Sequence, residues 1–164
     1  MNTWIIQQGY PVITAKWSSD YRHLIVSQKR FVSSLSPENF EAQKMNNSAL
    51  AQLWIVPLTI IDGQHNQSQL YWLNDSSMII PLKNGDGNKW FKLNHHQSGF
   101  YRVNYENSIW GVIINQLIQG NHVLSVADRA GLIDDALTLM RIGHLDVNTA
   151  MDLTRYLGYS DSVR

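Results

Sequence analysis

The 164-residue chain contains no cysteine, so it forms no disulfide and offers no thiolate to a metal ion. This absence does not fix a compartment, because secreted proteins also contain cysteine-free segments. Charged residues make up only 16% of the chain, and the 13 basic and 13 acidic residues cancel. A nucleic-acid-binding domain normally shows a basic patch, and none is visible here. Sparse charge on a globular chain indicates that another domain covers part of its surface.

Long apolar runs are also missing. No stretch approaches the roughly 18–20 residues that a membrane helix needs. Residues 1–15 lack the basic start and the clean apolar run of a signal peptide. If the protein is secreted or membrane-bound, we expect the responsible segment to lie outside this chain.

The chain does contain short β-rich runs separated by polar turns. Residues 1–10 favour a short helical end that Gly9 terminates. Pro57 interrupts one run and has no backbone donor, so an edge position or a bulge is expected there. The spacing of the runs predicts an antiparallel β-sandwich over residues 11–105. The expected strands cover 11–17, 23–31, 52–62, 69–74, 77–82, 89–94 and 99–105, with a loop over 36–49 and a turn over 83–88.

The remainder of the chain has helical periodicity, and three helices are predicted from it. Gly120 and Gly143 end the first and the second, Ser125 to Asp128 form a capping box, and Asp146 caps the third. Together the two parts predict an all-β sandwich followed by the first helices of an α-solenoid-like domain. The expected buried positions are Trp110, Ile113, Ile114 and Leu117, then Val126, Ala130, Ile133, Leu137 and Met140, then Ala150, Leu153 and Leu157.

His95 and His96 are the pair that most resembles a metal site. Neighbours on a strand face opposite sides, and no third ligand is close in the sequence, so a solvated turn is the favoured interpretation. No His-Glu-x-x-His pair exists in the chain. We therefore expect no catalytic, metal-binding or substrate-binding residue.

Asp134 and Asp135 form a second candidate pair, within the second predicted helix. Neighbouring helical side chains point about 100° apart, which disfavours paired acid–base chemistry. The favoured interpretation is that one carboxylate faces solvent and the other pairs with a cation such as Arg129. The Asn-Gly-Asp-Gly run at 84–87 lacks the acidic ligands of a calcium loop and the Lys-Ser/Thr of a phosphate loop, so a turn is expected.

Three Asn-x-Ser sequons, at Asn46, Asn66 and Asn74, fall in predicted loops and are candidate N-glycosylation sites. Composition alone would give about two such matches, so they support an extracellular location only weakly. The tryptophans leave two alternatives open, a sugar-binding platform or core packing. Core packing is favoured for those within apolar runs, which are Trp54, Trp72, Trp90 and Trp110.

Five stretches resemble the aminopeptidase N family of zinc aminopeptidases (gluzincins). MNTWIIQQGYPVI (1–13) resembles the end of its catalytic domain, and SQKRF (27–31) and LWIVPLT (53–59) resemble strands that follow. WFKLNHHQSGFYRVNYE (90–106) and DRAGLIDDALTLMRIGHLD (128–146) resemble its Gly-Tyr-Tyr-Arg-Val-Asn-Tyr signature and its Asp-Arg-Ala helix. The matches occur in family order and span nearly the whole chain.

The resemblance implies a domain arrangement. Residues 1–10 would be the tail of the catalytic domain, 11–105 the β-sandwich domain, and 106–164 the first helices of a C-terminal helical domain. The parent enzyme would remove N-terminal residues from peptides with a zinc-activated water, but the family's zinc-binding and substrate-binding motifs are absent here. We expect the chain alone to be inactive and to bind no zinc. Met1 coincides with an internal Met of the family, so the chain is expected to be a truncated gene model, a splice form or a fragment.

The resemblance also implies a structural role for the Gly-Phe-Tyr-Arg-Val-Asn-Tyr strand, which would close the sandwich and position the helical domain over the active site. Arg102 and Asn104 are expected to hydrogen-bond to a helix or loop, and Gly99 to allow a close approach or a positive φ. The expected junction residues are Gly99, Tyr101, Arg102, Asn104, Tyr105, Arg129, Asp134 and Asp135.

The implied partners are the parent's remaining catalytic and helical domains and its peptide substrate, with a homodimer through the helical domain also open. The parent would be extracellular or lumenal and membrane-anchored, with a cytoplasmic location as the alternative. A free-standing module that binds protein or carbohydrate is the alternative function. Exposed apolar surface at both ends of the chain would favour association with such a partner.

Overall fold

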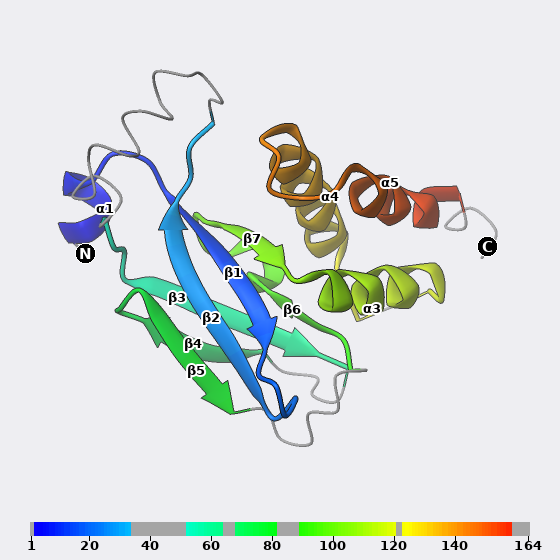
Figure 1. Ribbon diagram of the computed structural model, residues 1–164, viewed down its shortest axis with the longest axis horizontal. Helices are drawn as coiled ribbons and strands as arrows, with labels where there is room; N and C mark the ends of the chain where they lie inside the picture. Colours follow the sequence, from blue (N-terminus) through cyan, green and yellow to red (C-terminus); the bar gives the residue numbers. More distant parts are fainter. Residues whose placement is uncertain (1, 34–51, 64–67, 82–88, 121–122, 159–164) are drawn as a thin grey trace.

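The computed structural model describes residues 2–33, 52–63, 68–81, 89–120 and 123–158. Two β-sheets form a sandwich, with three helices at one end and a short N-terminal helix at the other (Figure 1). The predicted order of a β domain followed by helices is confirmed. The expected loop over 36–49, the expected turn over 83–88 and the sequon residues Asn46 and Asn66 lie outside the described residues.

Within the described residues, the sandwich has seven strands in two sheets. One sheet has the order β5-β2-β1-β7 and the other β4-β3-β6. Every recorded pairing is antiparallel except that of β1 with β7, which is parallel and sets Val12 opposite Arg102. The strands are β1 (Pro11–Trp17), β2 (His23–Arg30), β3 (Val56–Asp62), β4 (Gln69–Leu73), β5 (Ser77–Pro81), β6 (Phe91–Leu93) and β7 (Arg102–Tyr105).

Pro57 lies in β3, the central strand of its sheet, and not in an edge strand as predicted. The position still tolerates the lack of a backbone N–H group in proline. It faces Trp72 of β4 on one side, while β6 pairs only with Ile60 to Asp62 and does not reach it. The strand is central along its second half alone, so the physical constraint on Pro57 is met locally.

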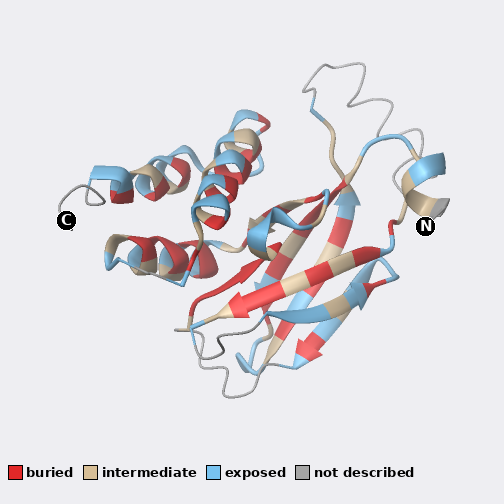
Figure 2. Cartoon of the chain, turned by 180° about the vertical axis from the view of Figure 1, so that it is seen from behind, coloured by how far each residue is buried: buried red, intermediate tan, exposed pale blue. Residues whose placement is uncertain are grey.

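Alternation along the strands builds the core, because successive side chains face opposite sides of a sheet. Buried positions line the inner faces of both sheets and continue onto the helices that face them (Figure 2). Trp72 departs from the expected pattern, since its side chain lies on the outer face of β4 and is 54% exposed. Trp54, Trp90 and Trp110 are buried, as expected.

Strand β7 connects the two sheets and the helices. Tyr101, Val103 and Tyr105 are buried between the sheets. The Tyr101 hydroxyl donates to the Pro57 carbonyl at 3.1 Å, and the Leu93 amide donates to the Tyr105 hydroxyl at 3.0 Å. Both bonds join the strand to the opposite sheet.

Most of the predicted helix signals are confirmed. The helices are α1 (Asn2–Ile6), α3 (Asn107–Ile118), α4 (Val126–Arg141) and α5 (Val147–Thr154), with 3₁₀ turns η1 (His95–Gln97) and η2 (Arg155–Gly158). Ser125 and Asp128 form the capping box of α4, and the Asp146 carboxylate accepts from two amides at the start of α5. Gly120 and Gly143 have φ of +80° and +75° after their helices. No helix within the described ranges is both long enough and apolar enough to span a bilayer.

The predicted buried face of α4 is wrong at Val126, Ala130 and Leu137, which are exposed, while Ile133 and Met140 are half-buried and pack against the core. Val126 is 72% exposed and Leu137 37% exposed. The face that packs inward carries Asp128 and Asp135, which form ion pairs with residues of β6 and β7. Leu157 is also 49% exposed, since the 3₁₀ turn after Thr154 changes the angular spacing of the side chains. The buried residues of α4 are Asp128, Gly131, Leu132, Asp135, Ala136 and Leu139.

Gly99 has no positive φ, and its role is a close approach. A Cβ at this position would lie 2.2 Å from Cε1 of the buried Tyr101 ring. We expect Gly99→Ala to lower the free energy of unfolding in urea by about 1–3 kcal/mol, because the Tyr101 ring, which is 5% exposed, must shift to admit the added methyl group. Gly111→Ala in α3 is the matched control, since nothing lies within 4 Å of its added Cβ. That control should raise stability by up to about 1 kcal/mol, and equal effects at both sites would contradict the close approach.

Candidate functional site

Helix α4 carries two buried aspartates on the side that faces the sandwich. Asp128 and Asp135 are 0% and 6% exposed. They are seven residues apart, which is about two helical turns, so they project from one face. Asp128 meets β6 in one sheet, and Asp135 meets β7 in the other. The helix therefore holds an edge of each sheet through a separate carboxylate.

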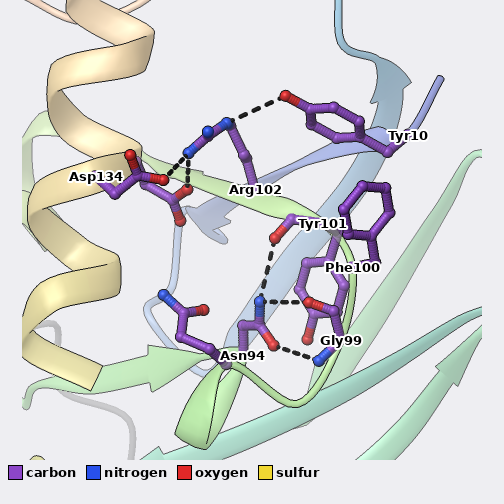
Figure 3. Close-up of a pocket in the computed structure, with 9 residues that line it drawn as sticks. Tyr10, Asn94, Gly99, Phe100, Tyr101, Arg102 and Asp134 are labelled. Carbon is purple, nitrogen blue, oxygen red and sulfur yellow. Dashed lines mark hydrogen bonds and ion pairs between the residues drawn. The ribbon is translucent and has the colours of Figure 1, made fainter. Parts of the chain in front are cut away.

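The first contact centres on Arg102 of β7. Its Nη1 donates to Asp135 Oδ1 at 2.9 Å and to Asp134 Oδ2 at 2.5 Å, and its Nε donates to the Tyr10 hydroxyl at 3.3 Å (Figure 3). The other oxygen of Asp135 accepts the Val103 amide at 3.0 Å. Asp135 is thus bound by both a side chain and the backbone of the strand.

Both aspartates of the predicted pair bind Arg102 and not Arg129, so the predicted partner is wrong. Arg129 lies about one and a half turns earlier on α4, on the same element as the two carboxylates. A strand residue 32 positions away in the chain meets them instead. The prediction that one of the two faces solvent is confirmed, since the side chain of Asp134 is 68% exposed.

An open pocket of about 320 Å³ lies beside this contact. Tyr10 packs face to face on Phe31 at 4.9 Å and edge-on against Phe100 at 5.2 Å, and the Arg102 guanidinium carbon lies 5.8 Å from the Phe31 ring centroid. The charges lining the pocket are already paired with one another, so it has no free ionic group for a reaction. Its lining residues are Tyr10, Asn94, Gln97, Gly99, Phe100, Tyr101, Arg102, Asp134 and Asp135.

Burial sets the electrostatics of this contact. It raises the pKa of Asp135 to about 6, and the Val103 amide and the Arg102 guanidinium only partly oppose that rise. Burial also acts against the charge of Arg102, but hydrogen bonds to Asp134, Tyr10 and Asp135 outweigh it and raise the pKa of Arg102. Arg102 is therefore charged at every accessible pH, and Asp135 is the group that titrates.

The raised pKa of Asp135 predicts a pH dependence of stability. The folded chain binds the proton of the Asp135 carboxyl group more tightly than the unfolded chain does. The stability that this proton adds is therefore complete below about pH 4 and is lost as the pH rises through about 6. Between pH 4 and pH 7, we expect the free energy of unfolding in urea to fall by about 2–3 kcal/mol more for wild type than for Asp135→Asn. Asp134→Asn is the neighbouring control and should retain that loss. Parallel pH profiles for wild type and Asp135→Asn would rule out this role.

The second contact is a buried ion pair. Lys92 Nζ lies 3.0 Å from Asp128 Oδ1, with the side chains 2% and 0% exposed. The ammonium also donates to the carbonyls of Leu93 and Asn94 at 3.0 and 2.7 Å, so all three of its protons have partners. Burial lowers the pKa of Lys92 against the attraction of Asp128. Burial would raise the pKa of Asp128, but the Ser125 hydrogen bond and the Lys92 charge lower it overall.

The adjacent histidines meet the same carboxylate, so the structure supplies the third ligand that the sequence lacked. The rings of His95 and His96 are tilted by 37° with their centroids 3.8 Å apart, and together with Asp128 they are a group that could hold a metal ion. Their Nδ1 atoms lie 3.2 and 3.8 Å from Asp128 Oδ2. His96 has φ of +57°, a left-handed conformation that brings both rings to one side.

The carboxylate, however, has little capacity left for a cation. Asp128 Oδ1 accepts from Lys92 and from the His96 amide at 2.7 Å, and Oδ2 accepts from the Ser125 hydroxyl at 2.7 Å. The Lys92 ammonium would also repel a metal ion. His95 Nδ1 is buried without a hydrogen-bond partner among the described residues, although Asp128 Oδ2 lies 3.2 Å away. We interpret the cluster as a structural ion pair.

Asn104, another predicted junction residue, also makes contacts between elements. Asn104 donates to the His144 carbonyl beyond α4 at 3.2 Å and accepts from the Trp110 indole of α3 at 3.2 Å. Sequence reasoning named Arg102 and Asn104, but it missed Lys92 and named Asp128 only as part of a helix cap. The available signal was a lysine between apolar residues in Phe91–Leu93. Such a lysine requires a buried partner.

The comparisons with known proteins fall on the same region. The family described as "ERAP1-like C-terminal domain" matches residues 90–163, so the match begins just before β6 and includes the last two strands. Human thyrotropin-releasing hormone-degrading ectoenzyme is 38% identical over 161 residues, covering 96% of this chain and 15% of that protein. Pig glutamyl aminopeptidase is 36% identical, covering 98% of this chain and 16% of that protein. Human aminopeptidase N is 36% identical, covering 96% and 15%.

Proposed function

This chain is homologous along nearly its whole length to part of the aminopeptidase N family, and we propose that it is a non-catalytic scaffold of a zinc aminopeptidase. The chain spans about 15% of the length of the curated relatives that it matches. In this proposal the parent removes N-terminal residues from peptides, and the segment positions the helical domain over the active site. The word "ectoenzyme" in the name of one relative supports an extracellular parent.

The observation that carries the proposal is the attachment of α4 to both sheets. Asp135 binds β7 through Arg102 and Val103, and Asp128 binds β6 through Lys92. Charged hydrogen bonds at two points, two turns apart, define the direction of a helix as well as its position. Such a joint would fix the orientation of the helices that follow relative to the sandwich. In the parent, the closure of those helices over the active-site cleft would govern the access of substrate.

A catalytic zinc does not fit the described residues. The His95, His96 and Asp128 cluster is the candidate group found among them, and its carboxylate is already bound by a cation and three hydrogen bonds. The whole sequence also lacks the His-Glu-x-x-His pair. We therefore assign the chemistry to the missing part of the parent and expect the isolated chain to hydrolyse nothing.

The carbohydrate-binding alternative has lost its sequence support. It needed several exposed aromatic rings, and three of the four tryptophans in question are buried. The protein-binding alternative is tested by the same chimera experiment that tests the scaffold proposal.

Two measurements test the scaffold proposal. The purified chain is assayed with a panel of aminoacyl fluorogenic substrates, with and without a chelator, and is expected to be inactive. This chain then replaces the matching segment of human aminopeptidase N, and the chimera is expected to retain chelator-sensitive turnover. A second chimera carries Arg102→Met, and a third carries Arg155→Met as its control. The Arg102→Met substitution should change kcat and KM while the zinc content of the chimera stays unchanged. Chelator-sensitive activity of the isolated chain, or indifference of the chimera to Arg102, would overturn the proposal.

A further inference from the structure

The outer face of β4 carries an exposed apolar patch. Leu70 and Trp72 are 55% and 54% exposed, and both project away from the buried Leu73. Pro57 of β3 lies opposite Trp72 in the register, and Thr59 lies opposite Leu70. Leu70 and Trp72 are neighbours on one face of the strand, so together they form a small apolar patch that a cover would remove from water.

Asn74 lies two residues after Trp72, and it opens the sequon Asn74-Asp75-Ser76. Strand β4 ends at Leu73, whose side chain faces inward, and Asn74 is the next residue. Continued alternation would place the Asn74 side chain on the same side as Trp72. Asn74 is exposed in the connection between β4 and β5. The connection between β4 and β5, which contains Asn74, lies at one end of the sandwich, away from α3, α4 and α5 (Figure 1).

The backbone of this connection is held in place. The Asp75 carbonyl accepts from the Gln28 side chain at 2.8 Å, and the Ser76 carbonyl accepts from the Gln28 amide at 2.9 Å. Gln28 is itself buried, at 4% exposed. A group attached to Asn74 would therefore stand on a rigid base beside the indole instead of moving with a loose loop.

We propose that Asn74 carries an N-linked glycan whose first N-acetylglucosamine packs against Trp72 and covers the patch. The C–H groups of a sugar ring carry partial positive charge and suit the negative face of an indole. The patch has an apolar centre, and the polar Thr59 and Ser98, whose hydroxyl oxygens lie 3.2 Å apart, are at its border. That composition fits an amphipathic sugar better than the apolar core of another domain.

Attachment is a group transfer from a lipid-diphosphate-linked oligosaccharide in the secretory pathway. The Asn74 amide nitrogen forms a bond to C1 of the first sugar as the bond from C1 to the diphosphate oxygen breaks. The lipid diphosphate leaves with the electron pair, and the amide loses one proton to a base. This step rests on the extracellular location in the proposed function, but not on peptidase activity.

The first test asks whether Asn74 is modified. The full chain is directed into the secretory pathway of cultured eukaryotic cells, and its peptides are mapped by mass spectrometry before and after enzymatic glycan release. We expect glycan on the Asn74 peptide, lost in Asn74→Gln and in Ser76→Ala. Mapping separates this site from Asn46 and Asn66. A folded, secreted chain with an unmodified Asn74 would overturn the proposal and leave the scaffold function standing.

The second test asks whether the glycan covers Trp72. In a chain with Asn46→Gln and Asn66→Gln, Tm is measured with and without Asn74→Gln, each in the wild-type and Trp72→Thr backgrounds. Removing the glycan should lower Tm by about 2–4 °C with Trp72 present and leave it unchanged with Trp72→Thr.

Ile79→Thr is the matched control, since Ile79 is 64% exposed on the other sheet and should leave the glycan effect intact. Oxidative footprinting provides a readout independent of stability, with Trp72 protected only when the glycan is present. Equal oxidation of Trp72 in both forms would show that the sugar does not cover it. Protection without any glycan would assign the patch to a protein contact instead.

Discussion

Replacing Lys92 with Met is expected to lower the free energy of unfolding at pH 7 by about 3–5 kcal/mol. The substitution preserves most of the side-chain volume but leaves the carboxylate of Asp128 without its cation. Asp128 is fully buried, so water cannot take the place of the ammonium. The remaining hydrogen bonds from Ser125 and His96 compensate only part of that loss. Urea unfolding followed by circular dichroism measures the change.

The control for Lys92→Met is Lys16→Met, because Lys16 is exposed on β1 and the change is chemically identical. Its effect should stay within about 0.5 kcal/mol. The double variant Lys92→Met with Asp128→Asn should recover much of the loss, since Asn can keep the helix cap without a buried charge. Failure of the double variant to recover stability would mean that packing of the lysine stem, and not charge, dominates.

Replacing Arg102 with Met is expected to cost about 3 kcal/mol at pH 7, the lower end of the range for a broken buried ion pair. The side chain of Arg102 is 21% exposed, so water reaches part of the site. Asp135, however, is left with only the Val103 amide as partner. The loss should shrink toward pH 4, because Asp135 then binds a proton and needs no cation.

The control for Arg102→Met is Arg155→Met. Arg155 also pairs with an aspartate, Asp152, at 3.4 Å, but its side chain is 63% exposed. Removing an exposed pair of this kind should cost at most about 0.5 kcal/mol. If Arg102→Met and Arg155→Met had similar effects, the contact between β7 and α4 would not be a structural joint.

Local signals in the sequence predicted the strands and the helix ends well. β1 matches its predicted range residue for residue, because Pro11 and the Ser18–Asp20 turn bound an alternating run. The capping box at Ser125 and the cap at Asp146 were also visible, since each needs only a side chain and the next two or three amides. These features depend on neighbours in sequence, which periodicity and turn chemistry report directly.

The predictions that were wrong concern contacts between segments that are far apart in the sequence. The buried face of α4 was misjudged because it was defined by the apolar residues alone, whereas Asp128 and Asp135 also lie on the inward side. Their partners, Lys92 and Arg102, lie more than 30 residues earlier in the chain. No periodicity on the helix itself records those partners. The same reason explains why Asp128 was missed as the neighbour of His95 and His96.

The parallel pairing of β1 with β7 has a consequence for synthesis of the chain. Val12 and Arg102 are about 90 residues apart, so one edge of β1 has no partner until the last strand has left the ribosome. At about 5–20 residues per second, that interval lasts roughly 5–20 s. An exposed strand edge over such a time invites pairing with other nascent chains. The sandwich is therefore a segment whose yield should depend on chaperones that bind extended chain.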